Sequence, residues 1–238
     1  MPDNKTYNKL GLYNSYDKNH KERDALDYYA TPTEEVESIL RHVNINFSEQ
    51  VILEPCVGGG HMLDGILNFL VDEIEFGYSK IPKHIISTDI KDRGAKEYCW
   101  RNAEDEKNIP QEGDKLFTFQ YDLDFLADDY PYNSVDYIIM NPPYSTIEPF
   151  TIRALEIAEK GVLMLARLQF LEGKGRYENI LSENPPTDVY VYVDRIKCYK
   201  NGDFSQTESS AQAYAWFFWN KEKEDKETKL HWIRRAED

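Results

Sequence analysis

The alternation of short apolar runs with segments of helical periodicity constrains the fold of this chain most strongly. Apolar runs at 51–53, 84–89, 116–119, 135–140 and 161–166 are separated by stretches with helical spacing, such as 147–158. This alternation indicates βαβ units, whose strands are parallel because each crossover returns the chain to the same end of the sheet. Further runs at 189–193 and 211–219 follow without a full helix between them, and 230–233 is a candidate last strand. The pattern predicts an α/β fold with a doubly wound, mostly parallel sheet and helices on both faces.

The 238 residues, 41% of them hydrophobic, suffice for one domain of this type. We expect a single domain over residues 25–238, preceded by a polar, mobile arm at 1–24. Its first helix is predicted to begin near Pro32, because Thr31 can cap it and Glu34 stands three residues later. Small insertions between about 170 and 210 are the candidate target-contacting part.

The sequence gives no sign of a membrane, a secretory leader or a metal. It lacks an apolar run of 18 residues, and its polar start does not resemble a signal peptide. Cys56, Cys99 and Cys198 are scattered without the spacing of metal ligands or of a disulfide framework. These features favour a cytoplasmic protein without a metal site or disulfides.

The net charge of −15 is unevenly distributed. Residues 25–166 carry 11 Lys/Arg and 26 Asp/Glu, which accounts for the whole excess of negative charge. A surface that binds nucleic acid is therefore expected in the last third of the chain or in the arm. The candidate DNA-binding residues are Lys174, Arg176, Arg195, Lys197 and Lys200. The alternative is that the acidity serves solubility and that no nucleic acid is bound.

A glycine loop between the first apolar run and a helical segment is a candidate ligand site. Glu54 stands four residues before Gly58, and Gly59 and Gly60 follow. Glycines allow close approach of the backbone to a ligand, at the strand ends where such sheets bind ligands. The pattern is neither the dinucleotide fingerprint nor a P-loop. An acid before the loop suits a cationic ligand, so the loop is interpreted as a cradle for the methionine part of S-adenosylmethionine.

Asp89 ends the second predicted strand, 29 residues after Gly60, where a carboxylate can accept both hydroxyls of a ribose. Asp92 is the alternative for this role, although it lies beyond the predicted strand end. His61, directly after the glycines, is interpreted as a bystander at the start of the helix. A tight strand-to-helix turn without any ligand is the structural alternative for the whole loop.

The Asn141-Pro142-Pro143-Tyr144 turn after the fourth strand has the most specific chemistry in the chain. Two prolines remove two N–H donors, which leaves the side-chain oxygen of Asn141 and the carbonyl of Pro142 as acceptors. An amine held between two acceptors loses conjugation with its ring, and its lone pair can then attack a sulfonium methyl group. Tyr144 offers an aromatic face for a planar group. A rigid proline turn without function is the alternative.

Taken together, the 54–60 loop and the 141–144 turn resemble those of the adenine-N6 DNA methyltransferases. The segment Asp27-Tyr28-Tyr29-Ala30-Thr31-Pro32 is similar to that family's upstream motif, and the motif order is similar to its gamma arrangement. The stretches 167–173 and 213–219 are similar to a small phage and prophage subgroup. The resemblance spans residues 27–234. It implies a Rossmann-like class I S-adenosylmethionine-dependent methyltransferase fold with a seven-stranded, mostly parallel sheet. It also implies DNA as the partner and flipping of the target base. The expected location is the cytoplasm of a bacterial or phage-infected cell, as for restriction–modification enzymes.

The resemblance also implies roles by position. Asn141, Pro142, Pro143 and Tyr144 would hold the target adenine. The cofactor would be bound by Tyr29, Thr31, Pro32, Glu54, Pro55, Cys56, Gly58, Gly60, Asp89, Asp124 and Phe125. Asp124 and Phe125 match a position that borders the adenine of the cofactor, with Asp122 as the competing register.

Three questions stay open on the sequence. Only about 70 residues follow the fifth strand, so specificity is expected to come from short segments, with 174–177 and the loop 200–205 as candidates, or to be loose, or to be supplied by a partner or a homodimer. The Asn-Pro-Pro-Tyr turn also occurs in RNA adenine and protein glutamine methyltransferases, and the upstream motif favours DNA while the acidity favours protein. A catalytically inactive binding module is the alternative outside enzymes, although none of the expected motif residues is replaced.

Overall fold

The structure is a computed structural model that describes residues 28–43, 45–75, 81–103, 116–206, 212–224 and 227–235. The predicted arm at 1–24 lies outside the described residues. Within the described part, no helix is long and apolar enough to span a bilayer, and no group of three or more His, Cys, Asp or Glu gathers to hold a metal.

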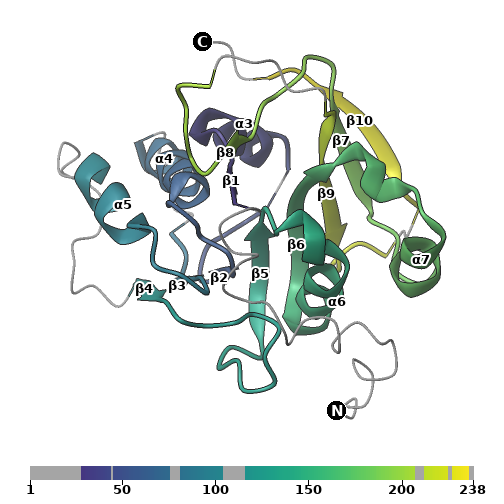
Figure 1. The fold of residues 1–238 in the computed structure, drawn as a ribbon, viewed down its shortest axis with the longest axis horizontal. Helices are drawn as coiled ribbons and strands as arrows, with labels where there is room; N and C mark the ends of the chain where they lie inside the picture. Colours follow the sequence, from purple (N-terminus) through teal and green to yellow (C-terminus); the bar gives the residue numbers. More distant parts are fainter. Residues whose placement is uncertain are drawn as a thin grey trace.

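An eight-stranded sheet forms the centre of the molecule (Figure 1). Its strands are β2 (Val51–Glu54), β3 (His84–Thr88), β4 (Phe117–Gln120), β5 (Val135–Met140), β6 (Ala158–Arg167), β7 (Asp188–Tyr192), β9 (Tyr214–Asn220) and β10 (Lys229–Ile233), in the order β10-β7-β9-β6-β5-β2-β3-β4. All neighbours are parallel except β9, which is antiparallel to β6 and β7. The mostly parallel α/β sheet is thus as predicted. The candidate strand at 230–233 joins it as β10, the eighth strand.

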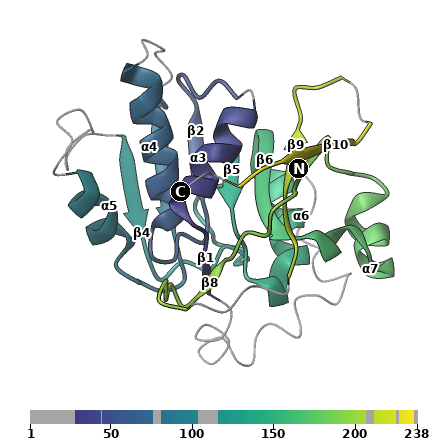
Figure 2. The same cartoon turned by 90° about the horizontal axis from the view of Figure 1, so that it is seen from above.

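Helices cover both faces of the sheet (Figure 2). They are α3 (Thr33–His42), α4 (His61–Glu75), α5 (Ala95–Ala103) and α6 (Ile147–Ile157), with short turns η1 (Tyr144–Thr146), η2 (Leu168–Leu171), α7 (Lys174–Arg176) and η3 (Tyr177–Leu181). Neighbouring strand residues point to opposite faces. Ile52 accordingly packs in the same core as Leu63 of α4, whereas Leu53 packs in the second core with Phe150 of α6.

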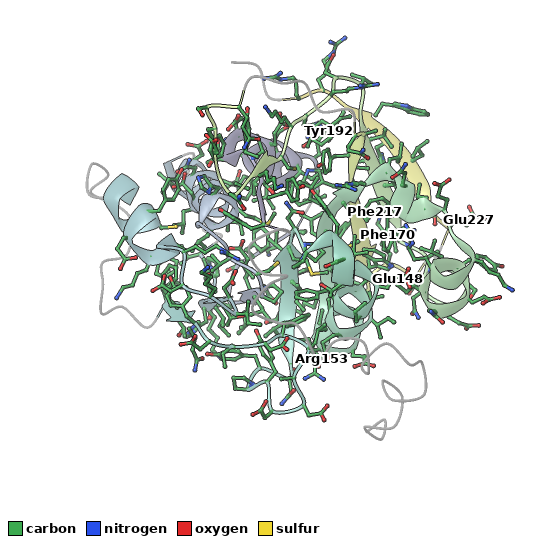
Figure 3. All side chains as sticks on the ribbon, in the orientation of Figure 1. Glu148, Arg153, Phe170, Tyr192, Phe217 and Glu227 are labelled. Carbon is green, nitrogen blue, oxygen red and sulfur yellow. The ribbon has the colours of Figure 1, made fainter. Side chains whose placement is uncertain are left out.

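Aromatic side chains fill the part of the second core next to the last strands. Phe170 of η2 contacts Phe217 of β9, with ring centroids 5.1 Å apart (Figure 3). Phe170 also meets the edge of Trp219. The turn that follows β6 is therefore fixed to the sheet, which gives the residues after Arg167 a defined position.

A two-stranded antiparallel ribbon of β1 (Tyr29–Ala30) and β8 (Tyr199–Lys200) lies apart from the main sheet. Tyr29 is paired with Lys200, and Ala30 with Tyr199. The ribbon joins the segment before α3 to the segment after β7, two parts of the chain that the sequence did not connect.

The predicted capping box of the first helix is wrong. Helix α3 begins at Thr33, its N-cap is Pro32, and no side chain caps it. The hydroxyl of Thr31 instead accepts a hydrogen bond from Nδ2 of Asn141 at 3.0 Å. The Thr31 hydroxyl, which the sequence pattern assigned to the helix N-terminus, therefore takes part in a tertiary hydrogen bond.

Candidate active site

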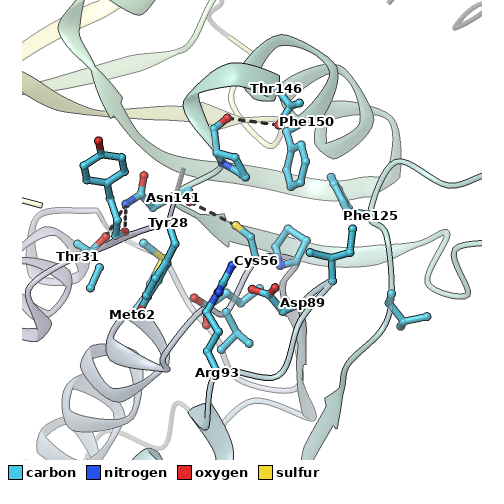
Figure 4. A pocket seen from close by; sticks show the side chains of 18 of the residues that line it. Tyr28, Thr31, Cys56, Met62, Asp89, Arg93, Phe125, Asn141, Thr146 and Phe150 are labelled. Atoms are coloured by element: carbon cyan, nitrogen blue, oxygen red, sulfur yellow. Dashed lines mark hydrogen bonds between the residues drawn. The ribbon is translucent and has the colours of Figure 1, made fainter. Parts of the chain in front are cut away.

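A pocket opens at the carboxyl edge of the sheet, where β2 lies between β3 and β5 (Figure 4). Strand order reverses at this point, which is where open α/β sheets bind ligands. Ten predicted site residues line it: Tyr29, Thr31, Glu54, Pro55, Cys56, Asp89, Asp124, Phe125, Asn141 and Pro143. The predicted residues Pro32, Gly58, Gly60, Pro142 and Tyr144 do not line it.

The glycines of the loop support the pocket but do not line it, whereas residues 54–57 of the same loop do. Gly58 has a φ of 57° and Gly60 one of 92°, values that side chains rarely adopt. A Cβ on Gly58 would stand 2.3 Å from Cε2 of Tyr28. The hydroxyl of Tyr28 in turn accepts a hydrogen bond from the backbone N–H of Gly59 at 2.8 Å. The glycines therefore allow Tyr28 to pack directly on the loop.

Two buried acidic side chains, Glu54 and Asp89, line the pocket. Glu54 is 2% exposed, and its Oε2 is buried without a hydrogen-bond partner. Burial, reinforced by the charge of Asp89, raises the pKa of Glu54 well above its usual range. A cation in the pocket would offset the cost of ionising this buried carboxyl group.

Asp89 is fixed by the backbone at both oxygens. Its Oδ2 accepts from the N–H of Gly58 at 2.8 Å, and its Oδ1 accepts from the N–H of Lys91 at 2.9 Å. Asp92, the alternative ribose ligand, is exposed, accepts from the N–H of Gly94 and does not line the pocket. The geometry favours Asp89 of the two.

Asp124 and Phe125 line the side of the pocket that follows β4, whereas Asp122 does not. Phe125 is 1% exposed and packs on Phe150 with ring centroids 5.0 Å apart. Oδ1 of Asp124 accepts from the N–H of Leu126 at 2.9 Å. Between the two registers left open by the sequence, the geometry favours Asp124.

The amide of Asn141 has a fixed orientation. Its Nδ2 donates to the carbonyl of Tyr29 and to Oγ1 of Thr31, both at 3.0 Å. Its Oδ1 is buried and has no hydrogen-bond partner. Because the nitrogen is already used, the free group on the side chain is an acceptor, and a buried acceptor without a donor is costly unless a ligand supplies one.

Tyr144 is more enclosed than the sequence suggested. Its hydroxyl donates to that of Tyr214 at 3.1 Å, and burial raises the pKa of its phenol well above the usual range. The ring of Tyr29 is tilted against it, with centroids 5.1 Å apart, and Cζ of Arg167 lies 4.3 Å from its centroid. A planar substrate can use the face covered by Arg167 only after the guanidinium moves.

A second pocket lies on the other side of the Asn-Pro-Pro-Tyr turn. It is lined by Tyr144, Ser145, Ile147, Glu148, Pro149, Arg167, Gln169, Phe170 and Arg176. Ser145 lines both pockets. Arg176 forms an ion pair with Glu148, with Nε 3.3 Å from Oε1, and donates to the carbonyl of Gln169. Residues of this turn therefore line both pockets, and the second pocket contains two arginines.

The predicted DNA-binding residues lie on separate segments. Lys174 and Arg176 belong to α7, Arg195 is exposed after β7, Lys197 precedes β8, and Lys200 ends it. Lys197 donates to the carbonyl of Gln206 and lies over the ring of Tyr199. Their role in DNA binding stays a prediction.

Sequence reasoning missed Tyr28, His61, Arg167 and Phe204 as residues around the two pockets. Tyr28 and His61 line the first pocket, and Arg167 lines the second. Phe204 packs on His61, with ring centroids 4.8 Å apart. Only the adjacent tyrosines at 28–29 gave any signal in the sequence, because the other contacts join residues far apart in the chain.

No protein family and no curated protein matches the chain in sequence. Solved structures do resemble it in fold. A type I restriction–modification methyltransferase subunit from Streptococcus thermophilus is 14% identical with a TM-score of 0.60, covering 89% of this chain and 48% of its own. A candidate RNA methyltransferase from Pyrococcus horikoshii is 18% identical with a TM-score of 0.55, covering 90% and 98%. A predicted O-methyltransferase from Agrobacterium tumefaciens is 11% identical with a TM-score of 0.51, covering 87% and 86%.

The chain has the class I methyltransferase fold. Its central sheet is mostly parallel, with β9 antiparallel to both of its neighbours, and helices cover both faces; this fold is similar to that of these solved methyltransferase structures. The chain spans about half the length of the restriction–modification subunits that it matches. Because the neighbours are named for different substrates, the fold alone does not identify the substrate of this chain.

Proposed function

We propose that this protein is an S-adenosylmethionine-dependent methyltransferase that acts on the exocyclic N6 amine of adenine in DNA. The observation that carries the proposal is the amide of Asn141, whose nitrogen is anchored and whose buried Oδ1 has no partner. This oxygen needs a donor, and an amine of a substrate is a donor that the pocket can receive. The class I fold and its structural neighbours support methyl transfer as the reaction.

The residues of the first pocket fit the proposed cofactor. Bound there, S-adenosylmethionine would supply an activated methyl group on a positively charged sulfur. Glu54 offers an unpartnered buried carboxyl group that suits a positive charge. Asp89 presents a fixed carboxylate for ribose hydroxyls, and Asp124 with Phe125 would border the adenine ring.

The proposed chemistry of the substrate site rests on acceptors, without a strong base. Oδ1 of Asn141 and the carbonyl of Pro142 would accept the two N–H bonds of the amine, which localises its lone pair on nitrogen. The nitrogen would then form a bond to the methyl carbon as the bond between that carbon and sulfur breaks, with S-adenosylhomocysteine as the leaving group, and the extra proton on nitrogen would pass to solvent. An adenine in duplex DNA would first have to leave the base stack, at a cost of a few kcal/mol.

DNA is the favoured substrate for two reasons. The segment 27–32 resembles the upstream motif of the DNA enzymes, and the structural neighbours include a restriction–modification subunit. RNA adenine is the second candidate, because a neighbour of similar length is named as a candidate RNA methyltransferase. A protein glutamine is the third, in view of the net charge of −15.

The test uses purified protein, S-adenosylmethionine with an isotopically labelled methyl group, and unmethylated DNA, RNA and bacterial protein in separate reactions. After digestion, mass spectrometry identifies the methylated product. We expect labelled N6-methyladenine from DNA, and none with Asn141→Ala. Label in RNA or in glutamine, with none in DNA, would replace the proposed substrate while retaining the reaction. If Asn141→Ala forms the labelled product as fast as the wild type does, the role proposed for the turn is refuted.

A further inference from the structure

His61 lies in an aromatic clamp at the rim of the first pocket. Its imidazole is tilted against the ring of Tyr98, with centroids 4.5 Å apart, and against that of Phe204 at 4.8 Å. His61 is the first residue of α4 and lines the pocket beside Tyr28 and Met62. Packing on two sides restricts rotation of the imidazole, so its nitrogens have defined directions.

One nitrogen of this imidazole has no partner. Nδ1 of His61 is buried and makes no hydrogen bond. A buried polar atom left in this state costs free energy of about 1–3 kcal/mol, and it is usually satisfied by a ligand or an ordered water. The neighbouring donor on the loop, the N–H of Gly59, is already taken by the hydroxyl of Tyr28. His61 is thus a polar group of this rim that remains available to a ligand.

Phe204 is held on His61 by the segment 199–206, which we call the roof segment. Tyr199 stacks on Phe204, with centroids 4.3 Å apart and planes 25° apart. The backbone of Asn201 donates to the carbonyl of Tyr28 at 2.8 Å, and β8 pairs with β1. Oδ1 of Asp203 accepts from both the N–H and the hydroxyl of Ser205. The roof segment therefore has its own internal structure and is attached to the rim of the pocket.

The position of His61 determines which part of a ligand it would meet. Phe125, beside Asp124, lies on one side of the pocket, Asp89 lies in the middle, and Tyr28 and Met62 lie on the other side (Figure 4). A ligand with its adenine at Phe125 and its ribose at Asp89 has its remaining part on the side of Tyr28. In S-adenosylmethionine this part is a zwitterionic amino acid, which carries both hydrogen-bond donors and acceptors.

We propose that His61 binds the amino-acid group of the cofactor through Nδ1, and that the roof segment fixes the imidazole for this contact by holding Phe204 against it. The inference rests on the proposed cofactor but not on the identity of the methylated substrate. The sequence predicted that the loop 200–205 contacts the target. The inference instead assigns this loop to the cofactor side of the site. The N-terminus of α4, a helix of 15 residues, adds a favourable field for the carboxylate of the same group.

The experiment compares two ligands that differ only in this group. S-adenosylhomocysteine contains the amino acid, whereas 5′-methylthioadenosine retains the adenosine and the sulfur without it. Calorimetric titration measures both dissociation constants for the wild-type protein and for His61→Phe, which keeps an aromatic ring in the clamp but removes the nitrogens. His42→Phe, at an exposed position that ends α3, is the matched control.

We expect His61→Phe to weaken S-adenosylhomocysteine by at least about tenfold, the effect of one hydrogen bond to a charged group, and to leave 5′-methylthioadenosine within about twofold. Phe204→Ala should likewise weaken S-adenosylhomocysteine more than 5′-methylthioadenosine, and it should increase the dissociation rate of S-adenosylhomocysteine. His42→Phe should leave both constants unchanged. Circular dichroism of each variant establishes that it is folded, and His61→Gln serves if the phenylalanine variant is not.

Two results would overturn the assignment of His61. Equal losses for the two ligands would show that His61 acts through the shape of the pocket, and an unchanged affinity for S-adenosylhomocysteine would show that it makes no contact with the amino acid. Failure of the wild-type protein to bind either ligand is a different result, because it refutes the proposed cofactor itself.

Discussion

The guanidinium of Arg167 lies over the ring of Tyr144, with Cζ 4.3 Å from the ring centroid. Nε of Arg167 is buried and has no hydrogen-bond partner, whereas the rest of the guanidinium also interacts with Tyr214, so the attraction of the cation for the aromatic face is one of two contacts that hold it. The contact joins the end of β6 to the turn that follows β5. It also covers a surface on which a flipped base could stack.

A double-mutant cycle should detect this contact. We expect Arg167→Met and Tyr144→Leu to be coupled by about 0.5–2 kcal/mol in the free energy of unfolding, measured with urea. Arg176 over Phe170 is the control pair, because its 5.9 Å separation and its ion pair with Glu148 predict a weaker coupling. Additive effects for the first pair would mean that the guanidinium is not held by the ring.

Asn141→Ala should abolish turnover while cofactor affinity changes little. The variant removes the acceptor Oδ1, but it also removes the bonds from Nδ2 to Tyr29 and Thr31. Thr31→Val separates the two effects, because it deletes one of these bonds and leaves Oδ1 in place. We expect Thr31→Val to retain measurable turnover. Single-turnover rates check this, and a similar loss in both variants would assign Asn141 a structural role.

Asp89→Ala should weaken S-adenosylhomocysteine by about tenfold or more, since the variant loses a charged acceptor for ribose hydroxyls. Its effect includes release of the N–H of Gly58, which Asp89 holds at 2.8 Å. Asp92→Ala, on an exposed side chain outside the pocket, should leave the constant unchanged. Calorimetry measures the dissociation constant for both variants. A larger loss of affinity in Asp92→Ala than in Asp89→Ala would assign the ribose contact to Asp92.

Glu54→Gln should stabilise the ligand-free protein at neutral pH and weaken S-adenosylmethionine. Burial, and then the charge of Asp89, raises the pKa of Glu54 above its usual 4.5. A group whose pKa is raised by folding favours the folded state below its unfolded pKa, and this contribution is lost as pH rises through the folded pKa. The stabilisation by glutamine should therefore increase with pH above about 4.5. Urea unfolding at several pH values checks this, and a pH-independent difference would contradict it.

A cluster on β7, far from the pockets in the fold, should control stability in acid. Asp188 accepts from Lys223, His231 and the hydroxyl of Thr187. Burial alone would raise the pKa of Asp188, but these hydrogen bonds outweigh it and hold the pKa below the usual 3.8. Its stabilising contribution is thus present above the unfolded pKa and is lost as pH falls through the folded value.

Asp188→Asn should lower the free energy of unfolding by about 2 kcal/mol at neutral pH, because the ammonium of Lys223 and the imidazole of His231 lose a carboxylate acceptor. The difference from the wild type should shrink as pH falls below 4, since the wild-type carboxylate is then protonated as well. Lys174→Ala is the control, because the pair of Lys174 with Glu178 is exposed. A deficit that persists unchanged into acid would show that packing, not charge, makes Asp188 important.

The pocket could be predicted from the sequence because its residues stand at strand ends. Glu54, Asp89 and Asn141 each follow a recognisable apolar run, and parallel strands bring their carboxyl ends to one edge. Topology then placed together residues that are far apart in the chain. This prediction does not depend on the total number of strands. The strand β10 lies at the edge of the sheet, and its presence does not alter which strand ends meet at the pocket.

The contacts around the pocket could not be predicted in this way. The ribbon of β1 and β8 has two residues in each strand, too few for any periodic signal. The bond from Asn141 to Tyr29 spans 112 positions. A second bond from the same amide engages the hydroxyl of Thr31, which local rules had assigned to the helix end. The stacking of Phe204 on His61 depends on how a long connection folds back, which no local pattern specifies.

One short stretch of backbone serves both halves of the proposed reaction. Tyr29 and Ala30 pair with the roof segment, while the carbonyl of Tyr29 and the hydroxyl of Thr31 hold the amide of Asn141. If the roof segment separates from the rim to exchange a spent cofactor, it pulls on the same strand that orients this amide. The acceptor for the substrate amine and the roof segment therefore share one mechanical support, and a displacement of that support would affect both.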